Sequence, residues 1–162
     1  MLENEIVSRP YFLRVDEGEA SWFLRNRMTV KATSESTNGA LSIIEATFAA
    51  GFSPPWHVHH REDEMMYVLE GDILFKCGDE LFRGGPGSFV FLPRDIPHSF
   101  KNLSNKPGRW LVLGTPAGLD RFFVESGTPA LAEGLNPLPP DFRKMAEVAA
   151  RYGQEILGPS PF

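Results

Sequence analysis

The chain has 162 residues, a formal net charge of −5 and one cysteine, Cys77. This length suits one domain that can bury a core of its own. The basic residues are scattered and form no stripe, so nucleic acid is not an expected partner. A lone cysteine excludes an internal disulfide and is typical of a reducing compartment. We expect Cys77 to be a small buried hydrophobe.

The N-terminal sequence carries no sign of export. Residues 1–10 read MLENEIVSRP, with acidic residues early and no apolar segment of the signal-peptide kind. No stretch approaches the ~20 apolar residues that a membrane-spanning helix needs. We therefore expect a soluble, cytoplasmic protein with no membrane partner.

The predicted elements up to residue 115 are short strands. They are rich in β-branched and aromatic residues, and turns with Gly, Pro or polar residues separate them. Residues 1–18 form an arm that includes the first of these strands. The expected strands are residues 11–15, 22–24, 28–30, 41–48, 65–69, 73–76, 80–83, 89–92, 99–102 and 109–115.

After residue 115 the pattern becomes helical. A short helix is expected at 119–125, and a connector rich in Pro and Gly follows at 127–140. Asp141 predicts the N-cap of a second helix that ends at Gly153. We expect its apolar stripe to pack against the outside of the β domain, and residues 158–162 to form a loose tail. The stripe consists of Phe142, Met145, Val148, Ala149 and Tyr152.

Three of the four histidines form a metal-ligand pattern with one glutamate. Side chains alternate along a strand, so His57 and His59 face the same side. A turn at 61–63 would begin the next strand and bring Glu64 back beside them. His98 lies far along the chain and must come from another strand. Two hairpins that converge on one interior point indicate a barrel, and three imidazoles with one carboxylate suit a mononuclear transition-metal site.

These residues resemble the two motifs of the cupin superfamily. The first motif is Gly51, His57, His59, Glu64 and Gly71, and the second is Gly87, Pro93, His98 and Asn102. Asp95 stands where the family often has glycine, and aspartate tolerates the left-handed conformation that such a turn requires. The flanks at 20–33 and 88–127 are similar to single-domain quercetin-dioxygenase-like cupins.

The resemblance implies an all-β fold, a double-stranded β-helix (jelly-roll) barrel with a short C-terminal helical extension. Each motif occurs once, which indicates a single barrel. The expected divisions are an N-terminal arm at 1–18, the cupin barrel at 19–117, and a helical extension and tail at 118–162. Jelly-roll cupins commonly pair, because an unpaired edge strand is a liability, and the arm favours a homodimer.

The resemblance also implies a quercetin 2,3-dioxygenase-like enzyme. Its substrate would be a phenolic, flavonol-like or 1,3-dicarbonyl small molecule, and Glu64 would be both metal ligand and catalytic base. The cofactor would be one divalent transition metal: Fe, Mn, Ni, Co, Cu or Zn. Two alternatives stay open: a non-redox metal-dependent isomerase, lyase or hydrolase, and a non-catalytic small-molecule-binding cupin.

Strand alternation suggests which side chains line the site. Counting from Glu64 places Met66 and Val68 inward, and counting from His98 places Phe100 inward. Thirteen phenylalanines favour an apolar or aromatic substrate, although such residues also simply fill small barrels. The further candidates, whose direction stays open, are Trp56, Phe75, Phe89, Phe91 and Asn102.

The neighbours of the ligands are assigned other roles. His60 should face the opposite side of its strand from His59. Glu62 and Asp63 are expected to be solvated turn charges. Asn102 is either an outer partner of the metal site or a side chain that bonds backbone.

Overall fold

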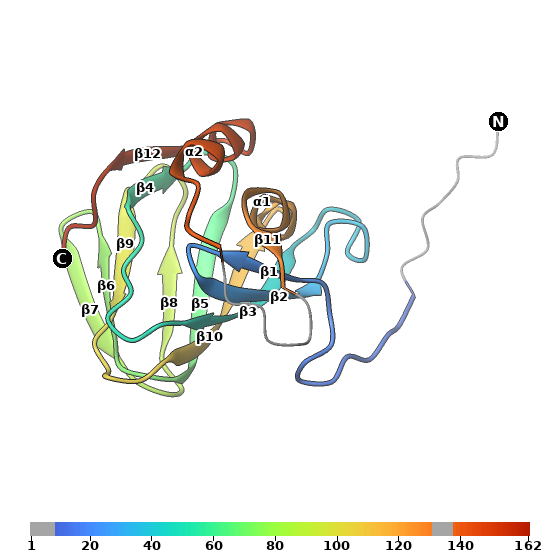
Figure 1. Ribbon diagram of the computed structural model, residues 1–162, viewed down its shortest axis with the longest axis horizontal. Helices are drawn as coiled ribbons and strands as arrows, with labels where there is room; N and C mark the ends of the chain where they lie inside the picture. The colour runs from blue at the N-terminus through green and yellow to red at the C-terminus, as the bar shows by residue number, and fades with distance from the viewer. Residues whose placement is uncertain (1–8, 131–137) are drawn as a thin grey trace.

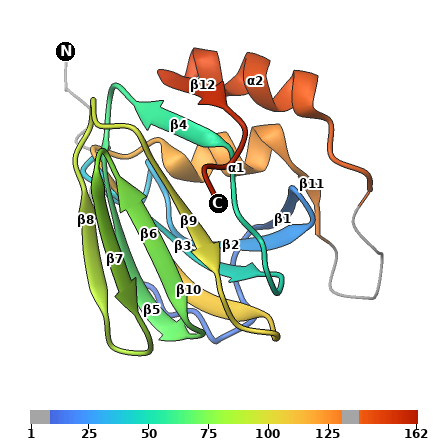
Figure 2. The same ribbon diagram turned by 90° about the vertical axis from the view of Figure 1, so that its left-hand side faces the viewer.

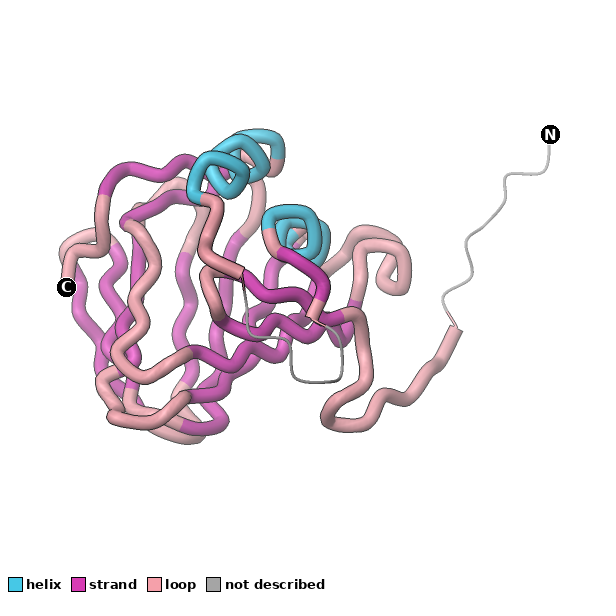
Figure 3. Tube along the Cα trace, viewed as in Figure 1, coloured by secondary structure: helices cyan, strands magenta, loops and turns pink. Residues whose placement is uncertain are grey.

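The computed structural model describes residues 9–130 and 138–162, and strands make up most of its regular structure (Figure 3). One sheet contains β1 (Ala20–Phe23), β2 (Asn26–Ala32), β3 (Ser42–Phe48), β5 (Asp63–Glu70), β8 (Phe89–Leu92), β10 (Gly108–Thr115) and β11 (Thr128–Pro129). The other contains β4 (Trp56–His59), β6 (Ile73–Cys77), β7 (Glu80–Gly84), β9 (His98–Asn102) and β12 (Gln154–Gly158). The helices are α1 (Leu119–Ser126) and α2 (Phe142–Arg151).

The two sheets face each other as the walls of a barrel (Figure 1). Their strand orders are β11-β1-β2-β3-β10-β5-β8 and β12-β4-β9-β6-β7, with antiparallel neighbours throughout. Pairs such as β3 with β10 are far apart in sequence, which is the connectivity of a jelly roll. The all-β barrel with a C-terminal helical extension is therefore confirmed.

The core lies between the sheets and follows strand alternation. On β3, Ile44, Ala46 and Phe48 are buried while their neighbours are more exposed. Trp110 of β10 is fully buried and stacks on Phe48 with ring centroids 4.3 Å apart. Cys77 is buried, as expected from the sequence.

The strand expected at 11–15 is absent. This part of the arm is exposed and runs beside β2, held by side chains that bond to backbone. The Tyr11 hydroxyl donates to the Lys31 carbonyl at 2.7 Å. The Lys31 ammonium in turn donates to the carbonyls of Arg14 and Val15 at 3.0 and 2.8 Å. The prediction was wrong because these bonds replace the sheet ladder that a strand would need.

Both helices lie across one end of the barrel (Figures 1 and 2). Asp141 caps α2 as expected, since its carboxylate accepts from the Lys144 backbone N–H at 2.9 Å. Met145 and Val148 are buried, whereas Phe142 is exposed. The expectation that α2 packs on the outside was wrong. The chain returns after α2 into the five-stranded sheet, and this return holds the helix over the barrel opening.

That returning segment, β12, was not expected from the sequence. It pairs with β4, with Gln154 opposite His59 and Ile156 opposite His57. The backbone N–H of Trp56 also donates to the carbonyl of Pro159 at 3.3 Å, so the tail begins as an ordered segment. Without β12, β4 would be an edge strand with unpaired backbone groups. None of the described helices is long and apolar enough to cross a membrane.

Candidate metal centre

The four residues of the ligand pattern meet inside the barrel. His57, His59, Glu64 and His98 each place one ligand atom within 4.8 Å of the others. His57 and His98 are direct partners across β4 and β9, with ring centroids 4.6 Å apart. Glu64 comes from β5 in the opposite sheet. The prediction of a hairpin between β4 and β5 was therefore wrong. Between these two strands the chain crosses from the five-stranded sheet to the seven-stranded sheet.

Two of the imidazoles are oriented by backbone carbonyls. His57 Nδ1 lies 2.7 Å from the Pro55 carbonyl oxygen, and His98 Nδ1 lies 3.1 Å from that of Ile96. A carbonyl only accepts, so each Nδ1 donates to it and each Nε2 faces the cluster. A metal-bound histidine is commonly held in this way, with one ring N–H on a carbonyl and the other nitrogen toward the metal.

The third imidazole is oriented by a buried carboxylate. His59 Nδ1 lies 2.7 Å from Glu62 Oε1, and Gln154 Nε2 donates to the same oxygen at 3.3 Å. Glu62 is only 4% exposed, so the expectation of a solvated turn charge was wrong. The residue lies where the chain crosses between the sheets, which turns its side chain into the protein.

Asp63 was also expected to be a solvated turn charge, and it too has a partner. Arg94 donates to it from the guanidinium at 3.0 Å and from the backbone N–H at 2.9 Å. The Arg94 hydrogen bonds hold the pKa of Asp63 below its usual value. This ion pair lies at the rim, outside the histidine cluster.

Three groups in the cluster have shifted pKa values. Removal from water would lower the pKa of His59, but the hydrogen bond with Glu62 and the charges of Glu64 and Glu62 outweigh it and raise this pKa. Removal from water, followed by the charges of His98 and His59, lowers the pKa of His57 to about 3, so this ring is neutral. Burial alone would raise the pKa of Glu64, but the imidazoles of His59 and His98 outweigh it and lower this pKa to about 2.

The types and positions of the donor atoms fit a metal ion. Neutral imidazole nitrogens and an ionised carboxylate are the forms that bind metals, so metal binding would displace the proton from any imidazole that carries one. Glu64 Oε2 lies 2.8 Å from His98 Nε2 and 3.6 Å from His59 Nε2, so the ligand atoms already converge. Nitrogen-rich sites of this kind suit first-row divalent ions.

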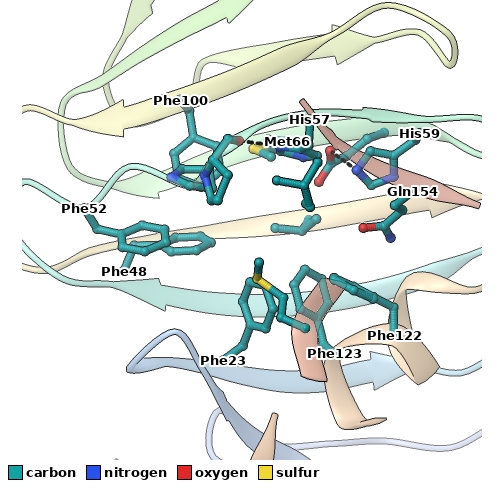
Figure 4. A pocket seen from close by; sticks show the side chains of 16 residues that line it. Phe23, Phe48, Phe52, His57, His59, Met66, Phe100, Phe122, Phe123 and Gln154 are labelled. Atoms are coloured by element: carbon teal, nitrogen blue, oxygen red, sulfur yellow. Dashed lines mark hydrogen bonds and ion pairs between the residues drawn. The ribbon is translucent and has the colours of Figure 1, made fainter. Parts of the chain in front are cut away.

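An apolar chamber of about 50 Å³ adjoins the cluster (Figure 4). Six phenylalanines, from both sheets, a loop and α1, are among the sixteen residues that line it, and α2 contributes Met145. β12 contributes Gln154 and Ile156. Among the lining residues that the structure describes, the only charged or titratable side chains are His57, His59 and Glu64. No lysine or arginine is among the described lining residues.

The sequence-predicted lining residues divide into four groups, three of which are buried. Met66 and Phe100 line the chamber. Val68 and Phe75 point inward but belong to the core beyond the chamber wall. Asn102 is fully buried and donates to the carbonyls of Ala49 and Lys106 at 3.1 and 3.0 Å. It bonds backbone, the second of its two expected roles.

Three aromatic candidates lie away from the chamber. Phe89 and Phe91 are 60% and 50% exposed, because the alternate residues of β8, Val90 and Leu92, are the ones that face inward. Trp56 is on the outer side of β4, where the Lys76 ammonium lies 5.9 Å from its ring centroid. The prediction that these three residues line the site was therefore wrong, because their side chains lie on the outer surface of the barrel.

His60 lies outside the cluster, as expected. It is exposed, and its Nδ1 is 2.7 Å from Asp95 Oδ1. Asp95 has a φ of 64°, so aspartate adopts the left-handed conformation expected where the family often has glycine.

The sequence interpretation missed several residues of the site. Phe122 and Phe123 of α1 and Gln154 of β12 come from segments far from the motifs. The position of Met145 in the helical stripe predicted that its side chain is buried, but not that it faces the chamber. No sequence signal pointed to Gln154.

Comparisons with known proteins agree with this geometry. A model of the cupin domain matches residues 44–114. Quercetin 2,3-dioxygenase of Bacillus subtilis (strain 168) is 32% identical over 97 residues, which cover 60% of this chain and 29% of that enzyme. The uncharacterized protein MJ1618 of Methanocaldococcus jannaschii is 31% identical over 75 residues, 46% of this chain and 60% of that protein. This chain thus spans less than two thirds of either relative.

Solved structures show the same fold. KdgF from Halomonas sp. superposes with a TM-score of 0.60 at 19% identity, over 70% of this chain and 98% of that one. A predicted oxalate decarboxylase from Thermotoga maritima gives a TM-score of 0.58 at 21% identity, over 65% and 99%. Residues 44–114 of this chain therefore form a cupin domain, and the described structure has the cupin fold.

Proposed function

We propose that this cupin is a metal-dependent dioxygenase acting on a small, uncharged phenolic or enolisable 1,3-dicarbonyl compound. The observation that carries the proposal is the convergence of four ligand atoms within 4.8 Å beside an apolar chamber. The 32% identity with quercetin 2,3-dioxygenase over 97 residues supports oxygenase chemistry in particular.

His57, His59, Glu64 and His98 would hold one divalent transition metal. When bound, Fe, Mn, Ni, Co, Cu or Zn would supply Lewis acidity, and the redox-active ions would also supply the electron transfer that dioxygen chemistry requires. Glu64 is ionised and would accept the proton of the substrate hydroxyl or enol. Its Oε2 is held 2.8 Å from His98 Nε2, which positions the acceptor atom in the cluster.

The chamber wall supports the proposed substrate class. Its lining is mostly apolar and offers no lysine or arginine among the described residues. An anionic phosphate or carboxylate would lose its hydration there without gaining a cationic partner. The apolar wall would also exclude water from the reacting groups.

The size of the chamber narrows the class further. Its volume of about 50 Å³ is well below the ~150 Å³ cavity that accommodates benzene in another protein. Even a single ring therefore requires a wall side chain to move. This favours one-ring phenols and small 1,3-dicarbonyls over a flavonol.

The test combines metal analysis with oxygen uptake. The purified protein should contain close to one redox-active metal per chain and should consume dioxygen when a one-ring phenol or acetylacetone is added. One metal per chain without uptake, but with product, would favour the isomerase, lyase or hydrolase alternative. Ligand-dependent stabilisation without product would favour a binding protein.

The role of Glu64 is tested by Glu64→Gln. This variant should keep part of its metal and lose uptake by ~100-fold or more, the size expected for loss of a general base. His60→Gln is the matched control, because His60 is exposed and outside the cluster. Unchanged uptake in Glu64→Gln at equal metal content would contradict the base role.

A further inference from the structure

One polar side chain interrupts the apolar wall of the chamber beside the motif residue His59. Gln154 lies on β12, paired in register with His59, and extends into the chamber (Figure 4). It is only 5% exposed. A buried amide needs partners for both its donor and its acceptor.

The orientation of this amide is determined by Glu62. Gln154 Nε2 donates to Glu62 Oε1 at 3.3 Å. A carboxylate only accepts, so the NH₂ end of Gln154 must face Glu62 and the carbonyl oxygen must face the other way. Glu62 is itself held by His59 Nδ1 at 2.7 Å.

The carbonyl end of Gln154 is left without a partner. Gln154 Oε1 makes no hydrogen bond with any described residue, and it is not one of the unpaired atoms sealed inside the protein. It is therefore an acceptor presented to the chamber. The rest of the nearby lining, Ile156 and Met145, has no donor to offer it.

We propose that Gln154 is a specificity-determining residue that accepts a hydrogen bond from a hydroxyl donor of the substrate. The inference rests on the proposed function and deepens it. The substrate would carry one hydroxyl or enol for Glu64 and a second hydroxyl at the end that faces β12. A ligand without the second donor would leave Gln154 Oε1 unpaired in a closed apolar site, and sites of this kind discriminate strongly against such analogues.

Binding of simple phenols to zinc-loaded protein tests the proposal without turnover. Resorcinol and hydroquinone carry a second hydroxyl that cannot chelate the same ion as the first, and phenol lacks it. Calorimetric titration should show at least one of the two diols binding ~10-fold or more tightly than phenol, as expected for a hydrogen bond with a buried acceptor. In Gln154→Leu and Gln154→Met this advantage should fall to within about twofold, with the affinity for phenol little changed.

Two further variants distinguish a hydrogen bond to Gln154 from general packing of the ligand against β12. Ile156→Val removes a methylene from the same strand and has no polar atom, so it should weaken phenol and the diols equally. Glu62→Gln leaves the Gln154 amide free to flip and should reduce the diol advantage. Zinc content and melting temperature, measured for each variant, establish that the site is intact in the variants compared.

The outcomes distinguish this inference from the proposed function. A diol advantage that survives in both Gln154 variants overturns the role of Gln154. Equal binding of phenol and both diols by the unmodified protein also overturns it, while leaving a phenol-binding site in place. If the unmodified zinc-loaded protein binds none of the three, the phenolic substrate class is wrong and the inference fails with it.

Discussion

Each histidine of the cluster is held at Nδ1 by a group that can only accept a hydrogen bond. Two of these acceptors are the carbonyls of Pro55 and Ile96, and the third is the carboxylate of Glu62. The imidazoles therefore need little reorganisation to bind a metal through Nε2. The short hydrogen bond from His59 Nδ1 to Glu62 should make His59 the most electron-rich of the three nitrogen donors.

Loss of one ligand should release the metal. We expect His98→Ala to weaken metal affinity by more than the ~10–100-fold that removal of an outer partner costs. Elemental analysis after dialysis against a weak chelator measures the retained metal. His60→Ala should retain as much metal as the unmodified protein. Full metal stoichiometry in a folded His98→Ala protein would show that His98 is not a ligand.

The lowered pKa of His57 makes the stability of the metal-free protein sensitive to pH. Its folded-state pKa is about 3, against 6.5 in a solvated chain. Below pH 6.5 the unfolded chain gains a proton that the folded chain excludes. This contribution to stability is therefore complete above pH 6.5 and is lost progressively as the pH falls toward 3.

His57→Asn should remove this contribution. With chelator present, we expect the free energy of unfolding of this variant to fall less between pH 7 and pH 4.5 than that of the unmodified protein. Urea denaturation at a series of pH values measures both slopes. Equal slopes would mean that His57 titrates normally in the folded state.

At the scale of elements, the C-terminal segment completes the site. β12 pairs with the ligand strand β4, and α2 lies over the end of the barrel that the chamber occupies. Met145 is 4% exposed and forms the part of the wall that α2 contributes. An unbranched methionine adapts its shape readily, so it is the wall residue best suited to yield to a ligand.

Met145→Ala should enlarge the chamber and relax its size limit. The variant should lose about 2–5 kcal/mol of stability, the usual consequence of truncating a buried methionine. It should also gain affinity for a two-ring phenol such as 2-naphthol relative to phenol, as thermal-shift titration would show. Val148→Ala, on the same helix but outside the chamber lining, should lose stability without this gain. The same ligand response in both variants would place Met145 outside the substrate path.

At the scale of the whole molecule, one face of the barrel is left apolar. Phe89 and Phe91 of β8 are 60% and 50% exposed, and Tyr67 lies opposite Phe89 on β5. β8 is also the last strand of its sheet, so within the described chain one of its edges has no strand partner. An apolar edge strand can pair with its own copy across a twofold axis, which satisfies both the backbone and the side chains. This face is our candidate for the homodimer interface.

The double substitution Phe89→Lys with Phe91→Lys should convert a dimer into a monomer. Sedimentation velocity measures the change, and the charged pair should act by opposing close approach of two copies. Phe142→Lys is the control, since Phe142 is equally exposed on α2 at 60%. A monomeric unmodified protein, or a dimer that persists in the double variant, would exclude this interface.

The sequence by itself determined the features that depend on local geometry. His57 and His59 share a face because side chains alternate in any strand. Asp141 caps a helix and Asp95 takes a left-handed turn because those preferences belong to the residue and its neighbours. The paired cupin motifs predicted the barrel and the grouping of His57, His59, Glu64 and His98, which the structure brings together.

Only the tertiary structure decided the features that depend on long-range pairing. The direction of Phe89 and Phe91 follows from the register of β8 against β5. The burial of Glu62 follows from a crossing between sheets, which replaces the expected hairpin. Gln154 reaches the chamber because β12 adds to the sheet beside β4. Strand register, crossings and strand addition are set by contacts between distant segments, so the sequence interpretation reached the metal ligands but not most of the chamber around them.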